Sequence, residues 1–321
     1  MGRTQTEGNT MEYRSLGNSG LKVSEIGLGG NNFGWYADEP TSIDVIHHAL
    51  DLGVNYIDTA DMYDRGTSET FIGKALKGKR SQVILATKFG YPMGDGPNEK
   101  GASSHYMVRA IENSLTRLKT DYIDLYQIHM PDPTTPIEET LRAFDDLIRS
   151  GKVRYIGCSN FAAWQLCEAL WTAKGCNLPS FVTVQSRYNM LEREIEKELV
   201  PCCQAYNIGV IPWGPLSGGF LTGKHSKGMK PKLYGEQPKP PPLYNPMFLD
   251  ANWDKLVKLE HFASERGHKL ADLAIAWLLA KPYVSTVIAG VRTKEQVSSN
   301  VATAEWRLTA EELNEVESIA K

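Results

Sequence analysis

Short hydrophobic runs alternate with amphipathic segments from residue 24 to the end of the chain. Most runs are bounded by glycine or polar residues, a pattern typical of strands that are buried on both faces of a parallel sheet. Eight strands are therefore predicted: "SEIGLGG" (24–30), "YID" (56–58), "VILATK" (83–88), "IDLYQIH" (123–129), "YIGCSN" (155–160), "FVTVQ" (181–185), "GVIPW" (209–213) and "STVIAG" (285–290).

The segments between these runs predict helices, because their apolar residues recur at spacings of three and four. Gly53, Gly151 and Gly209 follow three helical segments, at positions where a left-handed cap suits glycine. The expected apolar faces are Ile43, Ile46 and Leu50 in one helix, Val108, Ile111, Leu115 and Leu118 in another, and Ile137, Leu141, Phe144, Leu147 and Ile148 in a third.

Eight strand–helix units in a chain of 321 residues predict an α/β fold of the (β/α)8 TIM barrel type. A doubly wound open sheet produces the same alternation and stays open at this point. Residues 11–26 read as a β-hairpin ahead of the barrel, and residues 309–320 read as an extra C-terminal helix that begins with a capping box. We expect a disordered extension over 1–10, one domain over 11–321, and a long proline-rich loop over 222–250.

Composition and charge exclude several classes of protein. The net charge of −3 gives no electrostatic reason to expect nucleic acid as a partner. The most apolar helical stretch, "LADLAIAWLLA" (270–280), is too short to span a bilayer, and residues 1–10 lack the apolar core of a signal peptide. Neither the five cysteines nor the seven histidines have metal-site spacing. A cytoplasmic protein without a metal ion is expected.

Polar side chains gather at the ends of the predicted strands, which is where catalytic groups lie in a barrel of this type. Asp58, Lys88 and His129 end three successive strands, and Tyr63 follows the first of them. Each residue alone also has a structural explanation, as a turn cap, a solvated charge, a buried histidine or a partly buried tyrosine.

Together these four residues supply the groups that proton transfer to a substrate requires. A phenol has an ordinary pKa of about 10, and a nearby ammonium group is expected to lower it. Asp58 would keep Lys88 charged, Lys88 would tune Tyr63, and His129 would hydrogen-bond the reacting oxygen. This chemistry suits proton delivery to a carbonyl oxygen while hydride from a cofactor reaches the carbon.

Several motifs in order carry a resemblance to the aldo-keto reductase family: "NYIDTADMYDRGTSE", "LATKFG", "YIDLYQIHMPDP", "GKVRYIGCSNF", "VQSRYNMLER" and "IPWGPLSGGFLTGK". The resemblance runs from about residue 11 to the end. It implies a (β/α)8 barrel, reversible reduction of aldehydes or ketones, and a nicotinamide cofactor bound without a Rossmann domain. It also implies that Asp58, Tyr63, Lys88 and His129 form the catalytic tetrad, with Tyr63 as general acid.

The resemblance further implies a set of cofactor-binding residues. NADPH is expected rather than NADH, because Arg292 can make a two-pronged contact with a 2′-phosphate, although an exposed loop cation is the alternative for that residue. The implied cofactor residues are Ser159, Asn160 and Gln185 at the nicotinamide amide, Trp213 on the ring, Gly214, Pro215, Leu216, Ser217, Gly218, Leu221 and Lys224 along the pyrophosphate, and Gly290, Arg292, Gln296 and Asn300 at the adenosine end.

The substrate and the oligomeric state stay open at this stage, and a homo-oligomer is possible. The chain ends soon after its last helix, so a long C-terminal tail over the pocket is not expected and the pocket should be wide. A cofactor-binding regulatory subunit resembling the β subunits of potassium channels is the alternative function, since such proteins keep much of the same site. The expected pocket residues are Phe33, Trp35, Tyr36, Tyr91 and Met130.

Overall fold

The computed structural model describes residues 11–225 and 250–321, so the expectations for residues 1–10 and for most of the proline-rich segment lie outside the described residues. Eight parallel strands form one sheet in the order β10-β3-β4-β5-β6-β7-β8-β9. The strands are β3 (Ile26–Gly29), β4 (Tyr56–Asp58), β5 (Ile84–Phe89), β6 (Ile123–Ile128), β7 (Val153–Ser159), β8 (Thr183–Arg187), β9 (Gly209–Trp213) and β10 (Val287–Gly290).

The two edge strands of this sheet meet, which closes it into a barrel. Val210 in β9 forms a parallel bridge with Val284, just before β10. The amide of Val210 donates to the Tyr283 carbonyl, and the amide of Ser285 donates to the Val210 carbonyl, both at 2.9 Å. The predicted barrel is therefore confirmed, and the open sheet is excluded.

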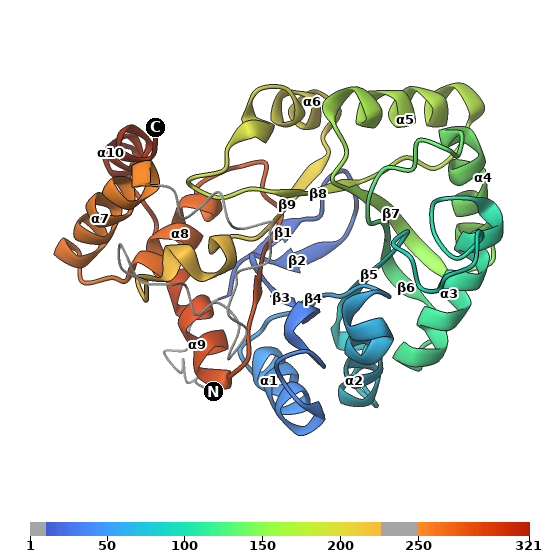
Figure 1. Cartoon of the computed structure of the whole chain (residues 1–321), viewed down its shortest axis with the longest axis horizontal. Coiled ribbons are helices and arrows are strands. Elements are labelled where there is room, and N and C mark those ends of the chain that lie inside the picture. Colours follow the sequence, from blue (N-terminus) through green and yellow to red (C-terminus); the bar gives the residue numbers. More distant parts are fainter. Residues whose placement is uncertain (1–10, 226–249) are drawn as a thin grey trace, which may run out of the picture.

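Helices surround the ring of strands (Figure 1). The barrel helices pack their apolar faces on the sheet and leave their charged faces in water, as the periodicity predicted. Helix α7 packs against α10 at one side of the barrel. The helices are α1 (Glu39–Asp51), α2 (Thr67–Ala75), α3 (Ser104–Leu118), α4 (Ile137–Arg149), α5 (Ala163–Cys176), α6 (Leu199–Tyr206), α7 (Asp250–Glu265), α8 (Leu270–Leu279), α9 (Lys294–Thr303) and α10 (Ala310–Ala320).

Short 3-10 helices complete the secondary structure, and helix ends mostly follow the expected chemistry. The capping box of α10 is present, since the Thr309 side chain accepts from the Glu312 amide and the Glu312 carboxylate accepts from the Thr309 amide. The 3-10 helices are η1 (Gly30–Asn32), η2 (Tyr63–Gly66), η3 (Arg80–Gln82), η4 (Glu194–Glu196) and η5 (Ser217–Thr222).

Two local predictions were wrong. Val108 is 45% exposed, because the buried face of α3 is turned toward Met107 and Ala110 instead. Gly209 does not cap a helix but begins β9; the left-handed cap of α6 is Asn207, whose φ is 56°. Among the other residue types, asparagine adopts this left-handed conformation most readily. Asn207 therefore caps α6 at the place where Gly209 was expected to do so.

An antiparallel hairpin closes the end of the barrel where the strands begin. It consists of β1 (Tyr13–Ser15) and β2 (Lys22–Ser24), as predicted, and lies in the middle of the strand ring in Figure 1. Leu16 and Val23 are fully buried against inward-facing residues of the barrel. Gly17, with φ of 53°, passes so close to Val182 that a Cβ would lie 1.8 Å from its carbonyl oxygen. The hairpin does not cover the opposite end of the barrel, where the strands finish and the candidate active site lies.

Candidate active site

Asp58, Lys88 and Tyr63 meet at the carboxyl ends of β4 and β5. The Lys88 side chain is fully buried, and its ammonium donates to Asp58 Oδ1 at 2.5 Å. It also donates to the Thr59 carbonyl at 2.8 Å and to the Tyr63 hydroxyl at 3.4 Å. A buried ammonium with a carboxylate on one side and a phenol on the other is the arrangement that proton transfer through Tyr63 requires.

The second oxygen of Asp58 is held by two amides. Gln127 in β6 donates to Asp58 Oδ2 at 3.3 Å, and Gln185 in β8 donates to it at 2.9 Å. Gln127 was missed by the sequence analysis, although a glutamine within a buried strand, two residues before His129, was an available signal. Gln185 uses one of its two side-chain N–H groups for Asp58, so the other N–H and the carbonyl oxygen remain for a ligand amide.

His129 lies beside Tyr63 within a group of aromatic rings. The imidazole packs edge-on against Tyr63, with ring centroids 5.8 Å apart, and against Tyr91 at 4.7 Å. Trp35 also packs against Tyr63, with ring centroids 6.2 Å apart, and is 47% exposed. His129 Nδ1 is buried, and no residue of the described segments hydrogen-bonds to it. The phenol and the imidazole therefore share one wall of a site with aromatic sides.

Burial decides the charge states of this cluster. It raises the pKa of the Tyr63 phenol, and the positive charge and hydrogen bond of Lys88 only partly offset this effect. The direction is opposite to the sequence expectation, which counted the ammonium but not the desolvation of the phenolate. Burial also disfavours the charged form of Lys88, but Asp58 and Tyr63 outweigh it and raise the lysine pKa. Burial and the charge of Lys88 hold the pKa of His129 well below its ordinary value, so the imidazole is neutral.

The chain turns sharply immediately after Tyr63. Asp64, Arg65 and Gly66 all have positive φ, at 45°, 52° and 92°. Two consecutive non-glycine residues in this region are uncommon, and such conformations persist only where the surroundings fix them. Gly66 is the N-cap of α2, so this turn leads from Tyr63 directly into the helix.

The ends of β7 and β9 bring three expected cofactor residues together, namely Ser159, Asn160 and Trp213. Asn160 has φ of 60° and uses its amide to bridge two parts of the site. Its Nδ2 donates to the His129 carbonyl at 2.9 Å and to Ser159 Oγ at 3.1 Å, and its Oδ1 accepts from Trp213 Nε1 at 2.9 Å. The Arg187 guanidinium, missed by the sequence analysis, lies 5.5 Å from the centroid of the Trp213 ring. Trp213 is thereby fixed beside the barrel mouth.

The loop after β9 is built from left-handed turns. Gly214, Ser217, Gly218 and Gly219 all have positive φ, and Asn189 donates to the Gly214 carbonyl at 3.0 Å. Successive turns of this kind can direct backbone amides to one side of a loop, as in loops that bind phosphate. Of the remaining residues expected here, Pro215, Ser217 and Leu221 are buried and Leu216 is half-buried, so Leu221 contributes through packing.

Positive charge gathers at the far end of this loop. The guanidinium of Arg292 lies 4.4 Å from the ring centroid of Tyr36. The backbone amide of Arg292 donates to Gln296 Oε1 at 2.7 Å. Partial desolvation and the charge of Arg292 lower the pKa of Lys224. Gly290 and Asn300 are the other two residues expected at this end; a Cβ on Gly290 would meet Asn31, and Asn300 is half-buried in α9. Two cations that repel each other suit an anionic ligand between them.

The five residues expected around the substrate do not lie together. Trp35 packs against Tyr63, and Tyr91 packs against His129. Met130 follows His129 in the chain. Tyr36 instead packs on Arg292, at the positively charged end of the loop. Phe33 is fully buried in the main hydrophobic core, where it packs the interior.

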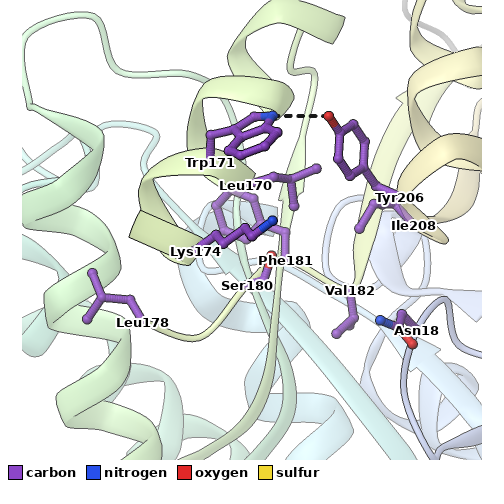
Figure 2. Close-up of a pocket in the computed structure, with 10 residues that line it drawn as sticks. All are labelled: Asn18, Leu170, Trp171, Lys174, Leu178, Ser180, Phe181, Val182, Tyr206 and Ile208. Carbon is purple, nitrogen blue, oxygen red and sulfur yellow. Dashed lines mark hydrogen bonds between the residues drawn. The ribbon is translucent and has the colours of Figure 1, made fainter. Parts of the chain in front are cut away.

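A hollow lies between α5 and α6, and none of these groups lines it. It has a volume of about 460 Å³, and Figure 2 shows Trp171, Lys174 and Tyr206 around it. Over residues 11–225 and 250–321, no helix is long and apolar enough to cross a membrane. No group of three or more potential metal ligands occurs within those same ranges.

Comparison with known proteins identifies the family. The model of the "Aldo/keto reductase family" matches residues 25–321. The chain is 40% identical over 312 residues to "Uncharacterized oxidoreductase YrpG" of Bacillus subtilis, covering 94% of this chain and 93% of the relative. It is 36% identical to "Probable voltage-gated potassium channel subunit beta" of Oryza sativa, covering 97% of each chain. It is 35% identical to "Versiconal hemiacetal acetate reductase" of Aspergillus parasiticus, covering 96% of each chain.

The barrel carries a buried lysine and a carboxylate at its strand ends, and a phenol in the segment that follows β4. These features and the family match over residues 25–321 define the class of this protein. The chain belongs to the aldo/keto reductase family. It is an oxidoreductase of that family, whose members typically depend on NAD(P)H.

Proposed function

We propose that this protein reduces aldehydes or ketones to alcohols with NADPH and catalyses the reverse oxidation as well. The single observation that carries the proposal is the buried contact of Lys88 with both Asp58 and the Tyr63 hydroxyl. A lysine held charged against a phenol has little structural purpose, whereas it stabilises the phenolate that remains when a proton leaves.

The roles of the four residues follow from their contacts. Tyr63 donates its proton to the oxygen of the carbonyl group, and the Lys88 ammonium stabilises the resulting phenolate. Asp58 keeps Lys88 charged at a position where burial disfavours that charge. His129 is neutral, so it can donate a hydrogen bond to the carbonyl oxygen without adding a competing positive charge. When bound, the nicotinamide supplies the hydride.

The residues present fit a nicotinamide dinucleotide. Ser159, Asn160 and Gln185 would hold the nicotinamide amide, and Trp213 would stack on its ring. The left-handed loop from Gly214 to Leu221 would lie along the pyrophosphate. Lys224 and Arg292 are close enough for their charges to interact, and a 2′-phosphate between them would relieve their repulsion. This last feature favours NADPH over NADH.

The site favours substrates with an aromatic or other flat apolar group. Trp35 packs against Tyr63, Tyr91 packs against His129, and Trp35 is about half exposed. Rings of this kind hold flat apolar groups well and leave the far end of a substrate in water. We therefore propose an open pocket that accepts a range of aryl aldehydes.

The test follows NADPH absorbance at neutral pH with a panel of aldehydes that begins with 4-nitrobenzaldehyde. We expect turnover by the wild type and loss of nearly all of it in Tyr63→Phe, while NADPH still binds. Tyr91→Phe is the matched control, because it removes a phenol from the same pocket but not the proposed acid. Strong activity in Tyr63→Phe would refute Tyr63 as the acid.

A second function is favoured by one observation. Three relatives at 36–38% identity carry names of the potassium channel subunit β type, and each alignment spans at least 90% of both chains. Under this alternative the chain is a cofactor-binding regulatory subunit that cycles its nucleotide slowly. Tightly bound NADPH in the purified protein, with no turnover over the whole panel, would favour the subunit over the reductase.

A further inference from the structure

Two cysteines from different helices touch on the outer side of the barrel. Cys167 lies in α5 and Cys202 in α6, and their sulfur atoms are 3.1 Å apart. Both residues are half-buried, so a small reagent can reach them from solvent. Neither belongs to the proposed active site or cofactor site.

The two helices hold this contact in register over more than one turn. Trp171 and Tyr206 lie four residues after Cys167 and Cys202, which is about one turn along each helix. Trp171 Nε1 donates to the Tyr206 hydroxyl at 3.0 Å, and Figure 2 shows this pair at the rim of the hollow between α5 and α6. Two parallel cross-contacts between the same helices keep the thiols facing each other.

We propose that Cys167 and Cys202 form a dithiol site that low-molecular-weight disulfides oxidise to an intramolecular disulfide. A disulfide bond is about 2.05 Å long, so sulfur atoms that already lie 3.1 Å apart need to approach by only about 1 Å. The site is a place of covalent modification in its own right, and it does not depend on the proposed reductase function.

The reaction is a pair of thiol–disulfide exchanges. The Cys167 thiolate attacks one sulfur of the reagent RSSR, forms a mixed disulfide and releases RS⁻. Cys202 then loses its proton to water and attacks the Cys167 sulfur, which forms the protein disulfide and releases a second RS⁻. Two protein thiols are oxidised, and one small disulfide is reduced to two thiols, so atoms and electrons balance.

The contact between the two thiols and the raised pKa of Cys202 together favour one order of attack. Burial and the hydrogen bond with Cys167 raise the pKa of Cys202 to about 12, so Cys202 is protonated at neutral pH. A protonated Cys202 can donate its hydrogen to a thiolate on Cys167. The order expected from this contact is attack by Cys167 followed by closure by Cys202.

The remaining cysteines are poorer candidates. Cys158 and Cys203 are fully buried, and burial raises the pKa of both thiols. Cys176 is half-buried at the last residue of α5, about two and a half turns beyond Cys167. These placements make the predicted oxidation specific for one pair.

The test incubates the full-length protein with oxidised glutathione and measures its intact mass, then maps the linked peptides without reduction. We expect a product that has lost two hydrogen atoms, carries no glutathione and returns to the starting mass with dithiothreitol. The oxidised form should also unfold at a higher urea concentration than the reduced form, because the bridge restricts the unfolded chain.

Cysteine-to-serine variants locate the bridge. Cys203→Ser and Cys176→Ser are matched controls and should still close the disulfide. Cys202→Ser should stop at glutathione attached to Cys167, and Cys167→Ser should form no bridge at all. A bridge that persists in Cys202→Ser, or a wild type that holds glutathione without closing, would overturn the proposal.

Discussion

Replacing Asp58 with asparagine removes the negative charge beside Lys88 and should destabilise the protein in a pH-dependent way. The Lys88 ammonium is fully buried and contacts Asp58 at 2.5 Å. Breaking one partner of a buried ion pair costs about 3–5 kcal/mol, because the other charge is left uncompensated. The new asparagine would also have to turn its NH2 group toward either Lys88 or the two glutamines, all of which are donors.

The buried lysine can avoid this cost by losing its proton. From an ordinary pKa of about 10.4, at about 1.36 kcal/mol per pH unit, deprotonation costs about 4.6 kcal/mol at pH 7 and about 1.9 kcal/mol at pH 9. In the variant the folded pKa of Lys88 falls below the unfolded value, so the unfolded state binds more protons and stability rises with pH. The deficit of Asp58→Asn should therefore be about 2 kcal/mol smaller at pH 9 than at pH 7.

The wild type provides the baseline for this comparison. In the wild type the pKa of Lys88 is higher in the folded state than in the unfolded state. The stability that this group contributes is therefore fully present below the unfolded pKa, and it is lost only as the pH rises through the higher folded pKa. Lys88 therefore adds no pH dependence to the wild type between pH 7 and 9. Urea unfolding at both pH values gives the two deficits.

The double variant Asp58→Asn with Lys88→Met removes the unpaired charge and acts as control. It should be more stable than Asp58→Asn at pH 7, and its deficit should not change with pH. An Asp58→Asn deficit that is equal at both pH values, or a double variant that is no more stable, would refute the account of Lys88 as a charge held by Asp58.

Three further predictions concern other parts of the molecule. Arg292→Ala should raise the KM for NADPH about tenfold and leave that for NADH nearly unchanged, because a charge-assisted contact is worth about 1.5–3 kcal/mol; equal effects would place the 2′-phosphate elsewhere. Gln127→Leu should lower kcat about tenfold, because it removes a hydrogen bond to Asp58. It should not lower the urea midpoint, because it also removes a buried oxygen that has no hydrogen-bond partner in the described residues. An unchanged kcat would refute a positioning role for Gln127. Gly17→Ala should cost about 1–3 kcal/mol more than Gly78→Ala, which shares a positive φ but meets no atom within 4 Å; equal melting shifts would contradict the close approach to the barrel.

The sequence predicted the strands, the hairpin and the barrel because hydrophobic periodicity and strand-end chemistry are local signals. Val108 was misplaced because an apolar residue at the right spacing can still fall at the edge of a helix face. The direction of the Tyr63 pKa was wrong because desolvation depends on how completely the assembled barrel covers the phenol. The placement of Tyr36 on Arg292 also depends on contacts between segments far apart in the chain, which no local pattern contains.

The contacts of the Asp58 carboxylate have a consequence for the order of folding. Its three hydrogen-bond donors lie 30, 69 and 127 residues further along the chain, in β5, β6 and β8. Contacts of such long range form late, after the entropy of closing long loops has been overcome. A chain emerging from the ribosome cannot complete this cluster until Gln185 has been made. Recovery of activity on refolding should therefore trail the recovery of helix content.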